Sequence, residues 1–148
     1  MAVKPKPDGH RAVTPYLVVA GAAKVIDFLK RTFDAQEIMR LDAPEGRIGH
    51  AELRIDDSLV MLGDAHGEHQ PTQAMLHVYV ADADATYRRA LAAGGISVQE
   101  PTDQFYGDRS GGVRDPCGNL WWIATHIEDV PPDELRRRAE AAMRQAGG

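Results

Sequence analysis

Apolar and polar residues follow one another along this chain in a pattern that predicts a strand, a helix and three further strands. Residues 13–19 are rich in β-branched and aromatic side chains and predict the first strand. Apolar residues between Ala22 and Phe33 recur at helical spacing, which predicts a helix there. The three strands that follow are predicted at 36–41, 49–55 and 58–62, the last two joined across a tight hairpin at Asp56-Asp57.

The same order of elements recurs in the second half of the chain. A strand is predicted at 75–80, a helix at 83–93, and strands at 97–100, 111–114 and 120–124. Tyr16 aligns with His77, and Leu59 aligns with Leu120, at a common offset of 61 positions. One offset at both ends of the repeated unit indicates an internal duplication.

The predicted fold class is therefore α+β, with two βαβββ modules and a C-terminal helix. The modules are placed at residues 13–64 and 75–126, and the helix at 131–146, where two prolines and two acidic residues form a suitable first turn. Residues 1–12 are predicted to be a disordered leader, because prolines at positions 5 and 7 block regular structure.

Composition and charge limit the partners that this chain can have. The chain has 148 residues and a net charge of −5, which disfavours binding to nucleic acid. It contains no apolar run near the ~20 residues of a membrane span, so no membrane partner is expected. The single cysteine, Cys117, excludes an intrachain disulfide and favours a cytoplasmic location.

The segment from Tyr106 to His126, YGDRSGGVRDPCGNLWWIATH, resembles the signature of the PhnB-like branch of the vicinal oxygen chelate superfamily. The stretches at 26–29 and 49–53 fit the same family. That superfamily includes glyoxalase I, ring-cleaving dioxygenases, fosfomycin-resistance enzymes and bleomycin-binding proteins. The resemblance implies that each module curls into a half-open cup, that two chains pair as a homodimer, and that divalent metals are held by residues of the first and last strands of each module.

In this chain the resemblance places Thr14, Met61, Met75 and Trp122 at the four metal-ligand positions. Threonine is a poor ligand, a thioether prefers soft metals, and the indole N–H can only donate. No metal and no other cofactor is therefore expected. His77 shares a strand face with Met75, so a shift of two residues in register would bring an imidazole to a ligand position.

Seven residues are predicted to contact a ligand: Tyr16, His50, Met61, His77, Tyr106, Arg109 and Trp122. His77, His50 and Glu52 are the candidates for acid–base catalysis. His50 and Glu52 share one strand face, which either lines the cup or is polar surface. Arg109 either clamps an anion or is bound by a neighbouring carboxylate. Trp122 either stacks on a ligand or belongs to the core, whereas His66 and His69 are expected to be solvated residues of the linker.

These features favour a metal-independent small-molecule-binding protein, which would sequester an antibiotic or a metabolite. The alternative is a lyase, isomerase or dioxygenase that depends on a metal or on a histidine. The sequence leaves open whether any reaction is catalysed and which ligand is bound.

Overall fold

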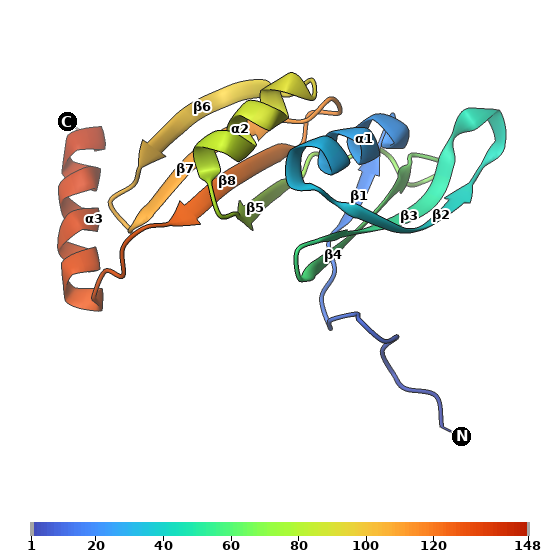
Figure 1. The fold of residues 1–148 in the computed structure, drawn as a ribbon, viewed down its shortest axis with the longest axis horizontal. Helices are drawn as coiled ribbons and strands as arrows, with labels where there is room; N and C mark the ends of the chain where they lie inside the picture. The colour runs from blue at the N-terminus through green and yellow to red at the C-terminus, as the bar shows by residue number, and fades with distance from the viewer. Residues whose placement is uncertain (1, 148) are drawn as a thin grey trace. The chain divides into compact units, whose positions relative to one another are not determined.

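The computed structural model describes residues 2–147, which form two compact units (Figure 1). Unit 1 comprises residues 2–74 together with Pro116–Gly118, and unit 2 comprises residues 75–115 and 119–147. Each unit contains one four-stranded sheet with a helix against one face.

Unit 1 contains β1 (Tyr16–Val19), α1 (Ala22–Phe33), β2 (Gln36–Asp42), the short 3₁₀ turn η1 (Pro44–Gly46), β3 (Ile48–Ile55) and β4 (Ser58–Asp64). Its strands lie in the order β1-β4-β3-β2. β1 runs parallel to β4, and the other pairs are antiparallel.

Unit 2 contains β5 (Met75–Tyr79), α2 (Ala83–Ala92), β6 (Ile96–Asp103), β7 (Asp108–Arg114), β8 (Leu120–His126) and α3 (Pro132–Gly147). Its strand order, β5-β8-β7-β6, repeats that of unit 1, and β5 again runs parallel to β8. The α+β fold with two βαβββ modules and a C-terminal helix is thereby confirmed.

The pairing register repeats the offset found in the sequence. Tyr16 lies opposite Met61 in unit 1, and His77 lies opposite Trp122 in unit 2. His77 follows Tyr16 by 61 positions, and Trp122 follows Met61 by the same number. Equivalent places in the two sheets can therefore be compared residue by residue.

One face of each sheet is buried beneath its helix. In unit 1, Phe28 and Leu29 of α1 are fully buried, as are Leu53 and Leu62 of the sheet. In unit 2, the buried side chains Trp121, Ile123 and Val113 share the sheet face that α2 covers. Because side chains alternate along a strand, the residues between these core positions point to the opposite, open face. The candidate ligand contacts Tyr16, Met61, His77 and Trp122 lie there.

Several strand boundaries differ from those that the sequence pattern predicted, and the starts of β1 and β7 each differ by three residues. The first strand begins at Tyr16 rather than at Val13, since Pro15 has no N–H for the ladder and contributes only its carbonyl, which accepts from the Met61 N–H. β7 begins at Asp108 rather than at Gly111. The polar residues at its start are held on both faces of the sheet, because Asp108 accepts from Tyr79 on one face and Arg109 donates to Asp84 on the other.

The C-terminal helix α3 has no buried residue among those described. Arg138 attaches it to the rest of unit 2, with its guanidinium donating to both carboxylate oxygens of Glu128 and to the carbonyl of Phe105. No helix in residues 2–147 is long and apolar enough to cross a membrane.

Candidate functional site

A chain of polar contacts crosses the open face of the unit 1 sheet. The Tyr16 hydroxyl lies 3.1 Å from Nδ1 of His50, and Nε2 of His50 lies 2.9 Å from Oε2 of Glu52. The second oxygen of Glu52 lies 3.4 Å from Nε2 of His10. These contacts join β1 and β3 to the segment that precedes β1, so that Glu52 has an imidazole on each carboxylate oxygen.

Strand alternation explains why these residues meet. His50 and Glu52 are two positions apart on β3 and therefore share a face, and Met61 separates Glu52 from Tyr16 in the sheet. Glu52 is only 8 % exposed. Burial and the charge of Glu52 together raise the pKa of the Tyr16 hydroxyl above its ordinary value.

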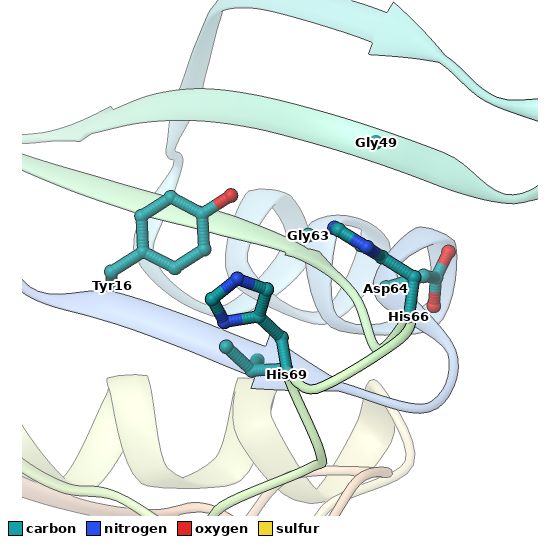
Figure 2. A pocket seen from close by; sticks show the side chains of 7 residues that line it. Tyr16, Gly49, Gly63, Asp64, His66 and His69 are labelled. Carbon is teal, nitrogen blue, oxygen red and sulfur yellow. The ribbon is translucent and has the colours of Figure 1, made fainter.

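A pocket of about 380 Å³ opens beside this polar chain (Figure 2). Its lining residues come from β1, β3, β4 and the segment after β4: Tyr16, Val18, Gly49, Gly63, Asp64, His66 and His69. The imidazoles of His66 and His69 lie edge to face with ring centroids 5.3 Å apart, and the backbones of these two residues form an isolated antiparallel bridge. Gly63 leaves room for the phenol, because a Cβ there would lie 3.0 Å from the Tyr16 hydroxyl.

Asp64, at the end of β4, connects the start of α1 to the start of β3 beside this pocket. One carboxylate oxygen accepts from the backbone N–H groups of Gly21 and Ala22 at the start of α1, at 2.8 and 2.9 Å. The other oxygen accepts from the Ile48 N–H at 2.8 Å. Burial alone would raise the pKa of Asp64, but the three N–H donors outweigh it and hold that pKa below its ordinary value.

Unit 2 carries a different pocket, of about 280 Å³, on its own open face. Its lining residues are His77, Gln99, Gln104, Tyr106, Ser110 and Trp122. The Trp122 ring packs against Gly112, where a Cβ would lie 2.8 Å from Cζ3 of the indole. Glycine at position 112 is therefore what allows the ring to occupy this place.

A second polar chain lies on the same sheet. The Tyr79 hydroxyl donates to Asp108 at 2.7 Å, and the other oxygen of Asp108 lies 2.8 Å from Nδ1 of His126. Nε2 of His126 lies 2.7 Å from Asp129. The hydrogen bonds to Asp108 and then to Asp129 raise the pKa of His126, and the hydrogen bond to Asp108 raises that of Tyr79.

Arg109 is not among the residues that line either of these two pockets. Its Nε and Nη2 donate to the two oxygens of Asp84 at 2.7 and 3.0 Å, and its Nη1 donates to Asp103 at 3.0 Å. It lies on the face of the sheet that α2 covers, because Asp84 is in the first turn of that helix. Of the two alternatives, the structure has the arginine bound by carboxylates.

The other predicted contacts fall into two groups, one in each unit. Tyr16, His50 and Met61 lie together on the unit 1 sheet, with Glu52 beside them. His77, Tyr106 and Trp122 line the unit 2 pocket.

Nine lining residues of the two pockets were not among the predicted ligand contacts: Val18, Gly49, Gly63, Asp64, His66, His69, Gln99, Gln104 and Ser110. His66 and His69 are exposed, as expected of solvated linker residues, but they also line the first pocket. Gln99 and Gln104 carried no signal in the sequence. The His-x-x-His spacing after a strand was the one feature that could have indicated the first pair.

The family model for the Glyoxalase/Bleomycin resistance protein/Dioxygenase superfamily matches residues 10–123. The chain belongs to this superfamily. An uncharacterized protein of Mycobacterium tuberculosis (strain ATCC 25618 / H37Rv) is 38 % identical to it over 158 aligned positions, which cover 99 % of this chain and 88 % of that protein. An uncharacterized protein of Mycobacterium bovis has the same identity, with 99 % of both chains covered.

Two solved structures share the fold of this chain. TioX from Micromonospora sp. ML1 is 26 % identical, with a TM-score of 0.65 and coverage of 82 % of this chain and all of the other. A PhnB protein from Bacillus cereus is 16 % identical, with a TM-score of 0.60 and coverage of 78 % of this chain and 99 % of the other. This second likeness concerns the fold alone.

The metal that the superfamily implies can be tested against the side chains present. The paired first and last strands place Tyr16 beside Met61 in unit 1 and His77 beside Trp122 in unit 2. Thr14 and Met75, the positions that the resemblance implied on the first strands, each come two residues before Tyr16 and His77, and Met75 is 69 % exposed.

A phenol, a thioether, an imidazole and an indole make a poor donor set for a hard divalent ion. Within residues 2–147, no three His, Cys, Asp or Glu side chains are grouped as metal ligands. The residues at the family's positions therefore do not fit a divalent metal.

Proposed function

We propose that this protein binds a small planar organic molecule in the pocket of unit 2, without a divalent metal. The observation that carries this proposal is the position of Trp122, which is half-buried against Gly112 and lines the pocket beside His77 and Tyr106. Aromatic side chains in a concave site favour flat ligands, because offset and edge-to-face ring contacts add to the gain from burial.

The polar lining of the pocket favours a ligand without a net charge. Gln99, Gln104 and Ser110 provide neutral hydrogen-bond donors and acceptors. Among the described residues that line this pocket, none is Asp, Glu, Lys or Arg. A charged ligand would lose hydration here, and no carboxylate, ammonium or guanidinium group of the described residues lines the pocket to offset that loss. The volume of about 280 Å³ suits a molecule of one or two rings, near the lower end of the range for ligand pockets.

Binding by itself is sufficient for the role that we propose. A protein that sequesters an antibiotic or a metabolite needs affinity and shape, whereas turnover needs groups that change the bonding of the ligand. The lining of this pocket is suited to stacking and neutral hydrogen bonding, which supports sequestration.

Binding of indole and 2-naphthol, measured by saturation-transfer NMR and titration, tests the proposal. Trp122→Ala should weaken binding about tenfold or more, which corresponds to about 1.4 kcal/mol. Phe105→Ala is the matched control, because Phe105 is an exposed aromatic residue that packs on Tyr106 but does not line the pocket. Unchanged affinity in Trp122→Ala would contradict the site.

Chelation tests the metal-independent part of the proposal separately. Treatment with EDTA followed by dialysis should leave the affinity for 2-naphthol unchanged. Loss of binding that is restored by Zn²⁺, Mn²⁺ or Fe²⁺ would show that a metal takes part.

We further propose that the protein is a cytoplasmic homodimer. A single cysteine, Cys117, in the thiol form fits a reducing compartment. Exposed apolar side chains on unit 2, including Met75, Ile96 and Met143, each about 70 % exposed, offer area for a contact between copies. Sedimentation at micromolar concentration should show a dimer, and a monomer alone would contradict this assembly. Cell fractionation tests the location.

A further inference from the structure

We propose that the unit 2 pocket selects cyclic amides, which are flat rings with an N–H group next to a carbonyl, and that Gln99 recognises this edge together with Gln104 and Ser110. This ligand class rests on the proposed function, since the same pocket binds it. The pocket wall has an imidazole and an indole on one side and two carboxamides and a hydroxyl on the other.

One row of paired residues crosses the whole unit 2 sheet along this pocket. His77 of β5 lies opposite Trp122 of β8, which lies opposite Gly112 of β7. Gly112 in turn lies opposite Gln99 of β6. The imidazole and the indole are therefore at one end of the row and the carboxamide is at the other, with only a glycine between them. A flat ligand over this row contacts rings with one part and an amide with the other.

The other neutral polar groups lie at the amide end of the pocket. Ser110 is on β7, two residues from Gly112 and on the same face of the sheet. Gln104 follows β6, where its N–H donates to the Asp108 carbonyl at 2.7 Å and its carbonyl accepts from the Gly107 N–H at 3.2 Å. Because this turn uses only the backbone of Gln104, the side-chain amide is left for a ligand.

A β-bulge brings the carboxamide of Gln99 to the row. Ser97 pairs with Val113, so strict alternation would place Val98 opposite Gly112. The register shifts between Ser97 and Gln99, and Gln99 takes that place instead. Bulges re-aim side chains in this way beside functional sites. The irregularity therefore exchanges an apolar group for one that forms hydrogen bonds.

The equivalent row in unit 1 ends in an apolar side chain. In pairing order that row consists of Tyr16, Met61, Glu52 and Met39. Met39 lies where unit 2 has Gln99, and it also follows a shift in register. The carboxamide therefore comes from the side chain at one position of unit 2 and not from the repeated architecture, which is what a specificity-determining residue requires.

The Ser110 hydroxyl is buried in the wall of the pocket. The residue is 2 % exposed, and its hydroxyl forms no hydrogen bond with another residue in the described range of 2–147. Buried polar groups are nearly always hydrogen-bonded, because a group without a partner lowers stability. A ligand with an N–H or a carbonyl at this place supplies the partner.

A carboxamide matches the edge of a cyclic amide, because it has a carbonyl acceptor and an N–H donor side by side in one plane. The ring N–H of the ligand donates to the Gln99 carbonyl, and the Gln99 amino group donates to the ligand carbonyl. Both polar groups of a cyclic amide lie in the plane of its ring, so the ring faces remain free to stack on Trp122. Pyrimidinones and quinolinones have this edge.

Titration of the wild-type protein with matched ligands tests this class. N-Methyl-2-quinolinone lacks the N–H of 2-quinolinone, whereas 3-methyl-2-quinolinone has the same added bulk and keeps the N–H. The two N–H compounds should bind about tenfold more tightly than the N-methyl compound in calorimetric titrations. Equal affinities for all three would overturn the proposed class.

Gln99→Leu removes the amide and keeps a side chain of similar size. The preference for the N–H compounds should fall from about tenfold to about twofold or less. Gln145→Leu, at an exposed position of α3, is the matched control and should keep the full preference. A preference that Gln99→Leu leaves intact would contradict the role of Gln99. If near-ultraviolet circular dichroism shows that this variant has lost its fold, Gln104→Leu and Ser110→Ala decide.

Ser110→Ala separates a role in binding from a role in the fold. The hydroxyl has no partner to lose, so the urea midpoint should stay the same or rise, while the affinity for 2-quinolinone should fall about threefold or more. Lower stability with unchanged affinity would contradict the role of Ser110.

The ligand class and the proposed function fail in different ways. Binding of 2-naphthol that depends on Trp122, without any preference for the N–H quinolinones, would overturn the ligand class alone. Absence of binding of 2-naphthol, indole and the quinolinones would overturn both.

Discussion

The indole of Trp122 and the backbone of Gly112 lie opposite each other on neighbouring strands, so close that residue 112 has no room for a side chain. The equivalent pair in unit 1 is Met61 opposite Glu52. In one module a large ring faces a glycine, and in the other a thioether faces a carboxylate. The two modules have therefore diverged by complementary changes at one cross-strand pair on the open face of each sheet.

Gly112→Ala should displace the Trp122 ring. The new methyl group would lie within 2.8 Å of the indole, and overpacking of this kind costs about 1–3 kcal/mol. Urea unfolding should show the loss of stability, and binding of 2-naphthol should fall with it. Gly49→Ala is the control, because a Cβ there meets its neighbours at 3.5 Å or more. Equal stability of the two variants would contradict the packing.

Asp64→Asn should loosen the start of α1 and the start of β3. An amide cannot accept on both of its ends, so at least one of the three backbone N–H donors loses its partner, at a cost of about 2 kcal/mol. Amide hydrogen exchange should accelerate at Gly21, Ala22 or Ile48. Asp42→Asn, at the exposed end of β2, should leave these amides unchanged.

The stabilising effect of Asp64 should also depend on pH. Because its pKa is lowered in the folded protein, the stabilisation is present above the unfolded value of about 3.9 and is lost as the pH falls through the folded value. The difference in stability between wild type and Asp64→Asn should therefore be constant near neutrality and shrink in strong acid. A difference that grows in acid would contradict this assignment.

His126→Asn should destabilise unit 2 most at low pH. The pKa of His126 is raised by Asp108 and Asp129, so its stabilisation is complete below the unfolded value of about 6.5 and disappears as the pH rises through the folded value. Unfolding of the wild type and the variant between pH 5 and pH 9, as an approximate range, measures this window. The two proteins should become similar at the alkaline end, and a gap that widens there would contradict the assignment.

Local pattern was sufficient for the order of strands and helices and for which residues of one strand share a face. The helix at Ala22–Phe33 was predicted with its observed bounds, since apolar spacing and helix geometry both depend on near neighbours in the chain. The offset of 61 positions between the modules is also found in the strand pairing, where Tyr16 lies opposite Met61 and His77 opposite Trp122. A duplicated pattern of apolar residues buries the equivalent alternate positions in both sheets.

Only the tertiary structure decided which side chains meet. The carboxylates that bind Arg109 belong partly to a helix 25 residues earlier, and nothing in the local sequence distinguishes that partner from a ligand. The same holds for Tyr16 and His50, which are 34 residues apart, and for Asp64 with the amides at the start of α1. The sequence by itself determined which residues of a strand share a face, because that depends on local periodicity. The partner of each polar side chain depends instead on how the strands pair and on which groups burial deprives of water.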